Sequence, residues 1–186
     1  MRLHMEGVKI GPRAQEVARA YKDTLDYRGL FLDGHACFAT LLADDRETHG
    51  KLLESVHDYL ESQRTGWNKD VTQRVGLPLM EGITQYFDGD YGKSVATLAP
   101  IMGELQTKIQ GSRAQKDVFR QILLSAAIKS GAKADLAQAK QVRLFEGRHV
   151  ELLVEYQVLA KELEESGLEG HKEVNQRIME RILAIH

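Results

Sequence analysis

Apolar side chains between residues 91 and 109 recur with the period of an α-helix. They are Tyr91, Val95, Leu98, Met102, Leu105 and Ile109, separated alternately by four and three positions. A β-strand places every second residue on one face, so it does not account for this spacing. The stretch predicts an amphipathic helix with one buried stripe.

A second helix is expected directly before this one, and the two should form a pair. Gly89, Asp90 and Tyr91 mark the turn between them. Small residues stand at Gly82 and Ser94, where two antiparallel helices would touch most closely. This spacing is typical of the helix-turn-helix unit of tetratricopeptide repeats.

Similar stripes predict helices along the rest of the chain. They lie after Gly11-Pro12 (Ala14, Val17, Tyr21 and Leu25), at about 30–43, from Asp44 to about 62, at about 112–131, 132–146 and 149–165, and around Val174, Ile178, Ile182 and Ile185. The helix after Ser112 should begin with a capping box, because Gln115 follows three residues later, and Gly131 should end it. Pro78 predicts a kink near residues 74–78.

The chain is therefore expected to be all-α. We expect about eight or nine helices in an irregular, right-handed, tetratricopeptide-like stack of antiparallel pairs. The 186 residues suit one domain that spans 1–186 and buries a single core.

The balance of charged residues limits the classes of partner that the chain is expected to bind. The chain has 25 Lys and Arg against 27 Asp and Glu, with no block of one sign. Binding to nucleic acid or to an anionic membrane needs a basic face, so neither is expected. The single cysteine, Cys37, leaves no intrachain disulfide, and no apolar run suits a signal peptide or a bilayer span. A cytoplasmic location is expected.

Three stretches carry a resemblance to a known family. They are residues 31–41 (FLDGHACFATL), 74–79 (RVGLPL) and 111–119 (GSRAQKDVF). In sequence, order and spacing they resemble the C-terminal half of the tetratricopeptide repeat protein 38 family. The resemblance covers residues 2–131 and implies a helical-repeat fold and protein binding, with no established catalytic residue or cofactor. Residues 132–186 diverge and are expected to form C-terminal capping helices.

The departures from the family pattern fall within these motifs or, at Gln110, directly before the third. Leu32 stands where the family has Asn, Gln110 where it has Gly, and Lys116 where it has Arg. The chain therefore resembles a truncated or divergent member.

Candidate partner-binding residues are polar and cluster in those motifs. They are Asp33, His35, Arg74, Arg113, Gln115 and Asp117. A structural explanation competes for most of them. Asp33 would stabilise a helix start, His35 would bond between helices, Gln115 would complete the capping box, and Arg113 and Lys116 would point outward.

Other residues allow two interpretations each. Trp67, in a polar connection at 63–69, is either an exposed anchor for a partner or a cover for the core edge. Ile178, Ile182 and Ile185 belong either to a terminal cap or to a surface for self-association as a homodimer. Cys37 is expected in the core rather than in catalysis.

The leading hypothesis is a non-enzymatic module that binds a protein, a peptide or a partner helix in a concave groove. One alternative is an enzyme, or a small-ligand or metal site, centred on Asp33 and His35. Another is a structural homo-oligomer formed through the C-terminal helices. No cofactor or metal is expected, since no metal-binding or phosphate-binding motif occurs.

Overall fold

The computed structural model describes residues 2–5, 10–22, 29–62, 65–132, 134–135 and 138–139, and this part of the chain is helical with no strand. The helices are α1 (Arg2–Met5), α2 (Arg13–Lys22), α3 (Leu30–Leu42), α4 (Arg46–Ser62), α5 (Trp67–Val71), α6 (Leu77–Phe87), α7 (Tyr91–Leu98), α8 (Met102–Lys108) and α9 (Arg113–Ser130). The all-α prediction is confirmed for these residues. The helices expected at 149–165 and around Ile178, Ile182 and Ile185 lie outside them.

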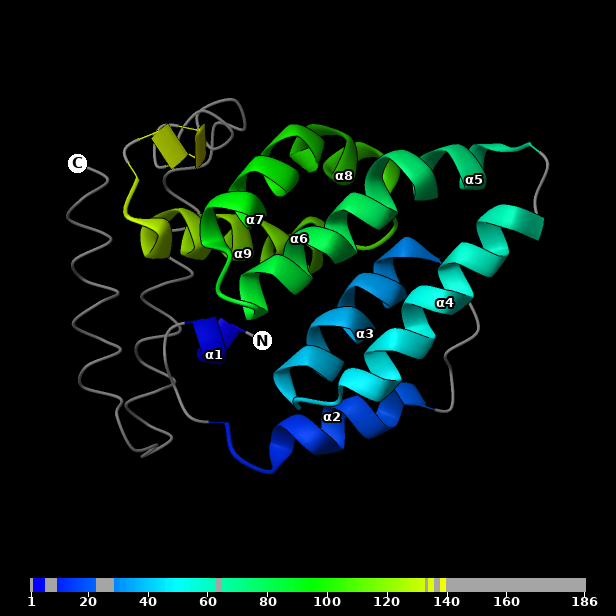
Figure 1. The fold of residues 1–186 in the computed structure, drawn as a ribbon. Helices are drawn as coiled ribbons and strands as arrows, with labels where there is room; N and C mark the ends of the chain where they lie inside the picture. Colours follow the sequence, from blue (N-terminus) through cyan, green and yellow to red (C-terminus); the bar gives the residue numbers. More distant parts are fainter. Residues whose placement is uncertain are drawn as a thin grey trace.

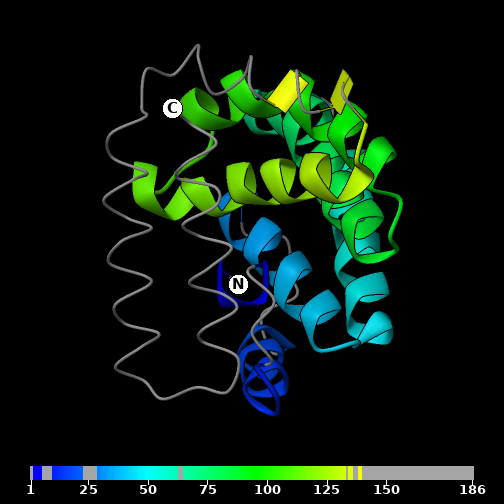
Figure 2. The ribbon, with the colours of Figure 1, turned by 90° about the vertical axis from the view of Figure 1, so that its left-hand side faces the viewer.

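The helices form two neighbouring groups (Figure 1). The first contains α2, α3 and α4, and the second contains α6, α7, α8 and α9. Helix α3 joins the groups because it packs on α2 and α4 on one side and on α6 on the other. Figure 2 shows α9 lying across α3, with the short helix α1 beneath it. Phe38 of α3 and Phe119 of α9 are both fully buried, so both groups contribute to one core.

Helices α6 and α7 form the close pair that the sequence predicts. The Ser94 hydroxyl donates a 2.7 Å hydrogen bond to the carbonyl oxygen of Gly82. A Cβ atom on Gly82 would lie 2.5 Å from Leu98, so only glycine allows this approach. Gly89 has a φ of 85° in the connecting turn, a value that favours glycine.

The prediction of one continuous helix over residues 91–109 is wrong in one respect. A 3₁₀ turn, Ala99–Ile101, separates α7 from α8. Pro100 lies in this turn and has no backbone N–H, so it cannot continue the regular hydrogen-bond pattern. The predicted stripe is nevertheless buried at Val95, Leu98 and Met102, because the turn keeps these side chains on one side.

The polar connection predicted at 63–69 is also shorter than expected. Trp67 begins α5 and is 58% exposed, so it does not cover the core. A π-helical segment, Thr72–Gly76, then leads into α6, and Pro78 lies in the first turn of that helix. The irregularity expected near residues 74–78 therefore takes the form of a π-helical segment before the proline.

Helix α9 begins and ends as predicted, but Lys116 does not point outward. Ser112 and Gln115 form the capping box, and Gly131 ends the helix with a φ of 68°. Lys116 is 6% exposed, and its ammonium group donates to the carbonyl oxygens of Gln106 (2.6 Å) and Ile109 (3.1 Å). The lysine thus bonds to carbonyl groups at the end of α8, which the helix leaves unsatisfied.

The apolar stripe predicted for the first long helix is only partly buried. In α2, Ala14 and Ala18 are buried, whereas Val17 is 43% exposed. Leu25 lies outside the described residues.

Candidate functional site

Asp33 and His35 lie in the first turns of α3. A carboxylate oxygen of Asp33 accepts a 3.2 Å hydrogen bond from the backbone N–H of Gly29, the residue that precedes the helix. The Nδ1 atom of His35 lies 2.7 Å from the carbonyl oxygen of Phe31, so Nδ1 carries the hydrogen. The His35 ring also packs against Phe119 of α9, with ring centroids 5.0 Å apart. Burial lowers the pKa of His35, and the bond to Phe31 opposes this shift.

Gln115 and Asp117 have hydrogen-bond partners on their own helix. The Gln115 side chain accepts from the backbone N–H of Ser112 at 2.9 Å. Asp117 is 5% exposed and accepts a 2.6 Å hydrogen bond from Gln121. A joint small-ligand site of these two residues with Asp33 and His35 stays a hypothesis.

Arg74 lies on the surface in the π-helical segment. Its guanidinium lies 3.0 Å from a carboxylate oxygen of Asp70 and 3.0 Å from one of Glu104. The pairing with Glu104 joins the segment to α8. Partner binding by Arg74 stays a prediction. The side chain of Arg113 and the three residues Ile178, Ile182 and Ile185 lie outside what the structure describes.

Cys37 is fully buried, as expected of a core residue. Burial raises the pKa of its thiol, which opposes formation of the reactive thiolate. Across the described residues, no group of three or more His, Cys, Asp or Glu side chains could hold a metal ion.

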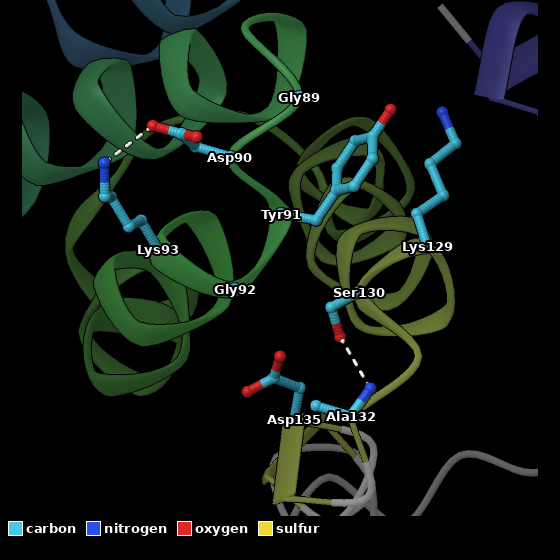
Figure 3. Close-up of a pocket in the computed structure, with 9 residues that line it drawn as sticks. All are labelled: Gly89, Asp90, Tyr91, Gly92, Lys93, Lys129, Ser130, Ala132 and Asp135. Carbon is cyan, nitrogen blue, oxygen red and sulfur yellow. Dashed lines mark hydrogen bonds and ion pairs between the residues drawn. The ribbon is translucent and has the colours of Figure 1, made fainter.

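An open recess of about 480 Å³ lies between the start of α7 and the end of α9. Residues 89–93 form one wall, residues 129–130 the other, and Ala132 and Asp135 form the base (Figure 3). Figure 3 shows Asp135 directed toward Gly92. A Cβ atom on Gly92 would meet only the Asp135 carboxylate, at 3.6 Å, so the missing side chain leaves this wall open.

Lys129 is held in a fixed position beside the recess. Its ammonium group donates a 2.8 Å hydrogen bond to the hydroxyl of Tyr86, which lies 3.0 Å from the hydroxyl of Ser125. The same ammonium lies 4.5 Å from the centre of the Tyr86 ring and 5.2 Å from that of the Tyr91 ring. Both contacts are within the range of cation–π attraction.

The opposite wall carries an ion pair. Lys93 lies 2.7 Å from the carboxylate of Asp90, and this hydrogen bond raises the pKa of the lysine. Two lysines, two aspartates and one tyrosine are thus among the residues that line the recess, and Figure 3 shows the Asp90–Lys93 pair extending away from Lys129 and Ser130. These groups can hold the charged and polar groups of a ligand.

Sequence reasoning missed the recess, although one local signal was present. The segment 89–93 reads GDYGK, where two glycines surround an acid and an aromatic residue. This signal predicts a turn, but it does not show that Lys129 lies beside it. That placement depends on the packing of α7 on α9.

The chain matches no family model and no solved structure. Its helices, as far as the structure describes them, include none with the length and apolar character needed to cross a membrane.

Proposed function

We propose that this protein is a non-enzymatic, cytoplasmic helical-repeat module that binds a segment of another protein. It would be a divergent member of the tetratricopeptide repeat protein 38 family, with an irregular right-handed stack of helix pairs. The observation that supports the binding function is the open recess between α7 and α9. Its lining includes lysine and aspartate residues together with Tyr91.

Two hydrogen bonds hold parts of the recess in place, which suits binding. Helix α7 is fixed against α6 by the bond between Ser94 and Gly82. Lys129 is fixed by Tyr86, so a ligand that meets its ammonium group would order few additional rotamers. Side chains that are already ordered reduce the entropy lost on association.

The chemistry of the recess fits a peptide better than a purely apolar ligand. A peptide carries carbonyl acceptors and N–H donors along its whole length. The Lys129 ammonium can donate to its carbonyls, and the Asp135 carboxylate can accept from its N–H groups. The open shape admits a continuous chain that enters and leaves the recess.

A substitution that fills the recess tests the proposal. Gly92→Trp places a large side chain where only the Asp135 carboxylate lies nearby. The matched control is Gly103→Trp on α8, because a Cβ atom there would meet no heavy atom within 4 Å. Both variants replace an exposed helical glycine, so they change intrinsic helix propensity equally.

The readout is capture of proteins by immobilised chain from an extract of its own source, with unfolding curves recorded for each variant. We expect the original chain and Gly103→Trp to capture the same protein in similar amounts. Gly92→Trp should capture at least about tenfold less of it, which corresponds to about 1.4 kcal/mol of binding free energy. Equal capture by all three chains would exclude the recess as the site.

A further inference from the structure

Helix α1 has only four residues, Arg2–Met5. An isolated helix of this length is not stable in water, since about 12 to 15 residues are needed even for marginal stability. The conformation of α1 therefore depends on its contacts with the rest of the chain. It lies against α9, close to α3 and α6 (Figures 1 and 2).

Two side chains of α1 make these contacts. The ring of His4 stacks on Phe87 with centroids 5.5 Å apart and an interplanar angle of 13°. It also meets Phe38 edge-on, with centroids 6.3 Å apart. Met5 is 5% exposed and belongs to the core. The His4 ring thus occupies an aromatic seat, defined by Phe38 and Phe87 with the charge of Lys129 nearby, and the buried Met5 follows it in the chain.

The seat is built by helices that hold one another without α1. Phe38 of α3 and Phe87 of α6 meet edge-on, with centroids 5.0 Å apart. Tyr86 of α6 bonds to Ser125 and Lys129 of α9. Because these contacts do not involve α1, the seat should persist when α1 leaves it.

The charge of Lys129 restricts what the seat can hold. Partial burial of His4 and, after it, the charge of Lys129 lower the pKa of the imidazole, which favours a neutral ring in the seat. A second cation at the same position would be repelled by Lys129. An uncharged ring followed by a flexible apolar side chain is the favoured occupant.

We propose that the aromatic seat is a docking site for one turn of a partner helix that presents an uncharged ring followed by Met, and that α1 is its internal occupant. A partner segment binds there by displacing α1. This inference rests on the proposed function in treating the chain as a binder of protein segments, but it concerns a different site from the recess.

The test uses the full chain and a synthetic peptide of residues 1–9, labelled with fluorescein. The double variant His4→Asp/Met5→Asp removes both side chains of α1 from the seat and leaves the seat itself intact. We expect this variant to bind the peptide saturably. The original chain should bind it at least about tenfold more weakly, because its own α1 competes at a high effective concentration.

A control peptide carries His4→Lys and Met5→Asp and should not bind either chain. Failure of the folded double variant to bind the unmodified peptide would overturn the proposal. Gly92→Trp, introduced into the double variant, should leave saturable binding of the peptide intact. Failure of the seat and failure of the recess are therefore distinguishable.

A second measurement applies if the double variant does not fold. NMR resonances of the His4 ring are recorded in the original chain, with and without excess peptide carrying His4→Phe, whose ring stays uncharged. Displacement of α1 takes the His4 ring off Phe87, so its ring-proton shifts should move toward those of an exposed histidine, with unchanged amide exchange in α6. Unchanged His4 ring resonances across the peptide titration would also overturn the proposal.

Discussion

The hydroxyl of Ser94 donates a 2.7 Å hydrogen bond to the carbonyl oxygen of Gly82, across the closest approach of α6 and α7. The bond is buried, and Leu98 fills the space where a Gly82 side chain would lie. The two residues together set the spacing of the helix pair that carries one wall of the recess.

Gly82→Ala should therefore destabilise the chain, although alanine favours helices. The new methyl group would lie 2.5 Å from the Leu98 side chain. Leu98 is fully buried, so it cannot move aside into solvent. We expect a loss of about 1–3 kcal/mol in the free energy of unfolding, measured with urea. Gly103→Ala is the matched control, and it should be neutral or stabilising by up to about 1 kcal/mol. An equal response of both variants would contradict the packing described here.

Lys116→Met should destabilise the junction of α8 and α9. The substitution keeps most of the side-chain volume but removes the donor to the carbonyl oxygens of Gln106 and Ile109. Leaving buried acceptors unsatisfied costs about 1–3 kcal/mol. Lys108→Met, an exposed change at the end of α8, serves as the control and should have little effect on the urea midpoint. A neutral Lys116→Met would show that these bonds contribute little to stability.

Arg74→Ala should leave stability nearly unchanged. Its ion pairs with Asp70 and Glu104 are solvent-exposed, and such pairs contribute about 0–1 kcal/mol. A loss of partner capture by this variant would therefore report on recognition rather than on folding. Partner capture and urea unfolding should be measured on the same preparation. A loss of unfolding free energy well above this range would contradict the prediction that these ion pairs contribute little to stability.

Stability should fall as the pH drops below about 6.5. His49 of α4 is 5% exposed, and His4 and His35 are half-buried. This burial is the largest cause that lowers the pKa of each of the three below its usual value of 6.5. The unfolded chain then binds more protons than the folded chain in this range. The stabilising contribution is complete above pH 6.5 and is lost as the pH falls through the lower folded-state values.

The check is the urea midpoint between pH 7.5 and 5.5. His4→Phe keeps the aromatic stacking on Phe87 but cannot titrate, so the pH dependence of its midpoint should be shallower. A midpoint in the original chain that is constant over this range would contradict the neutral state of the buried His49 and the half-buried His4 and His35.

Local signals explain why some elements could be predicted. The capping box of Ser112 and Gln115 and the ending at Gly131 lie within α9 itself, so the sequence around them was sufficient. The stripe of Val95, Leu98 and Met102 reflects burial along one side of the chain and persisted through the 3₁₀ turn at Pro100. Such patterns do not depend on distant residues.

Tertiary contacts explain what the sequence did not predict. Lys116 is buried because the end of α8 supplies carbonyl acceptors. The recess depends on residues 89–93 lying beside Lys129, some 40 positions later in the chain. Helix α1 is too short to show a period, and only its contacts with Phe38 and Phe87 reveal its place. None of these arrangements has a signature within a single helix.

Site-specific cross-linking tests most directly whether the recess binds a partner segment. A photoreactive diazirine analogue of lysine is placed at Lys93, which lines the recess, or at Lys108, which is exposed on α8 and does not line it. After irradiation with an extract of the chain's own source, the linked peptides are identified by mass spectrometry. The account predicts one recurring partner segment linked at position 93 and absent at position 108. The same linked proteins at both positions, or no link at position 93, would contradict it.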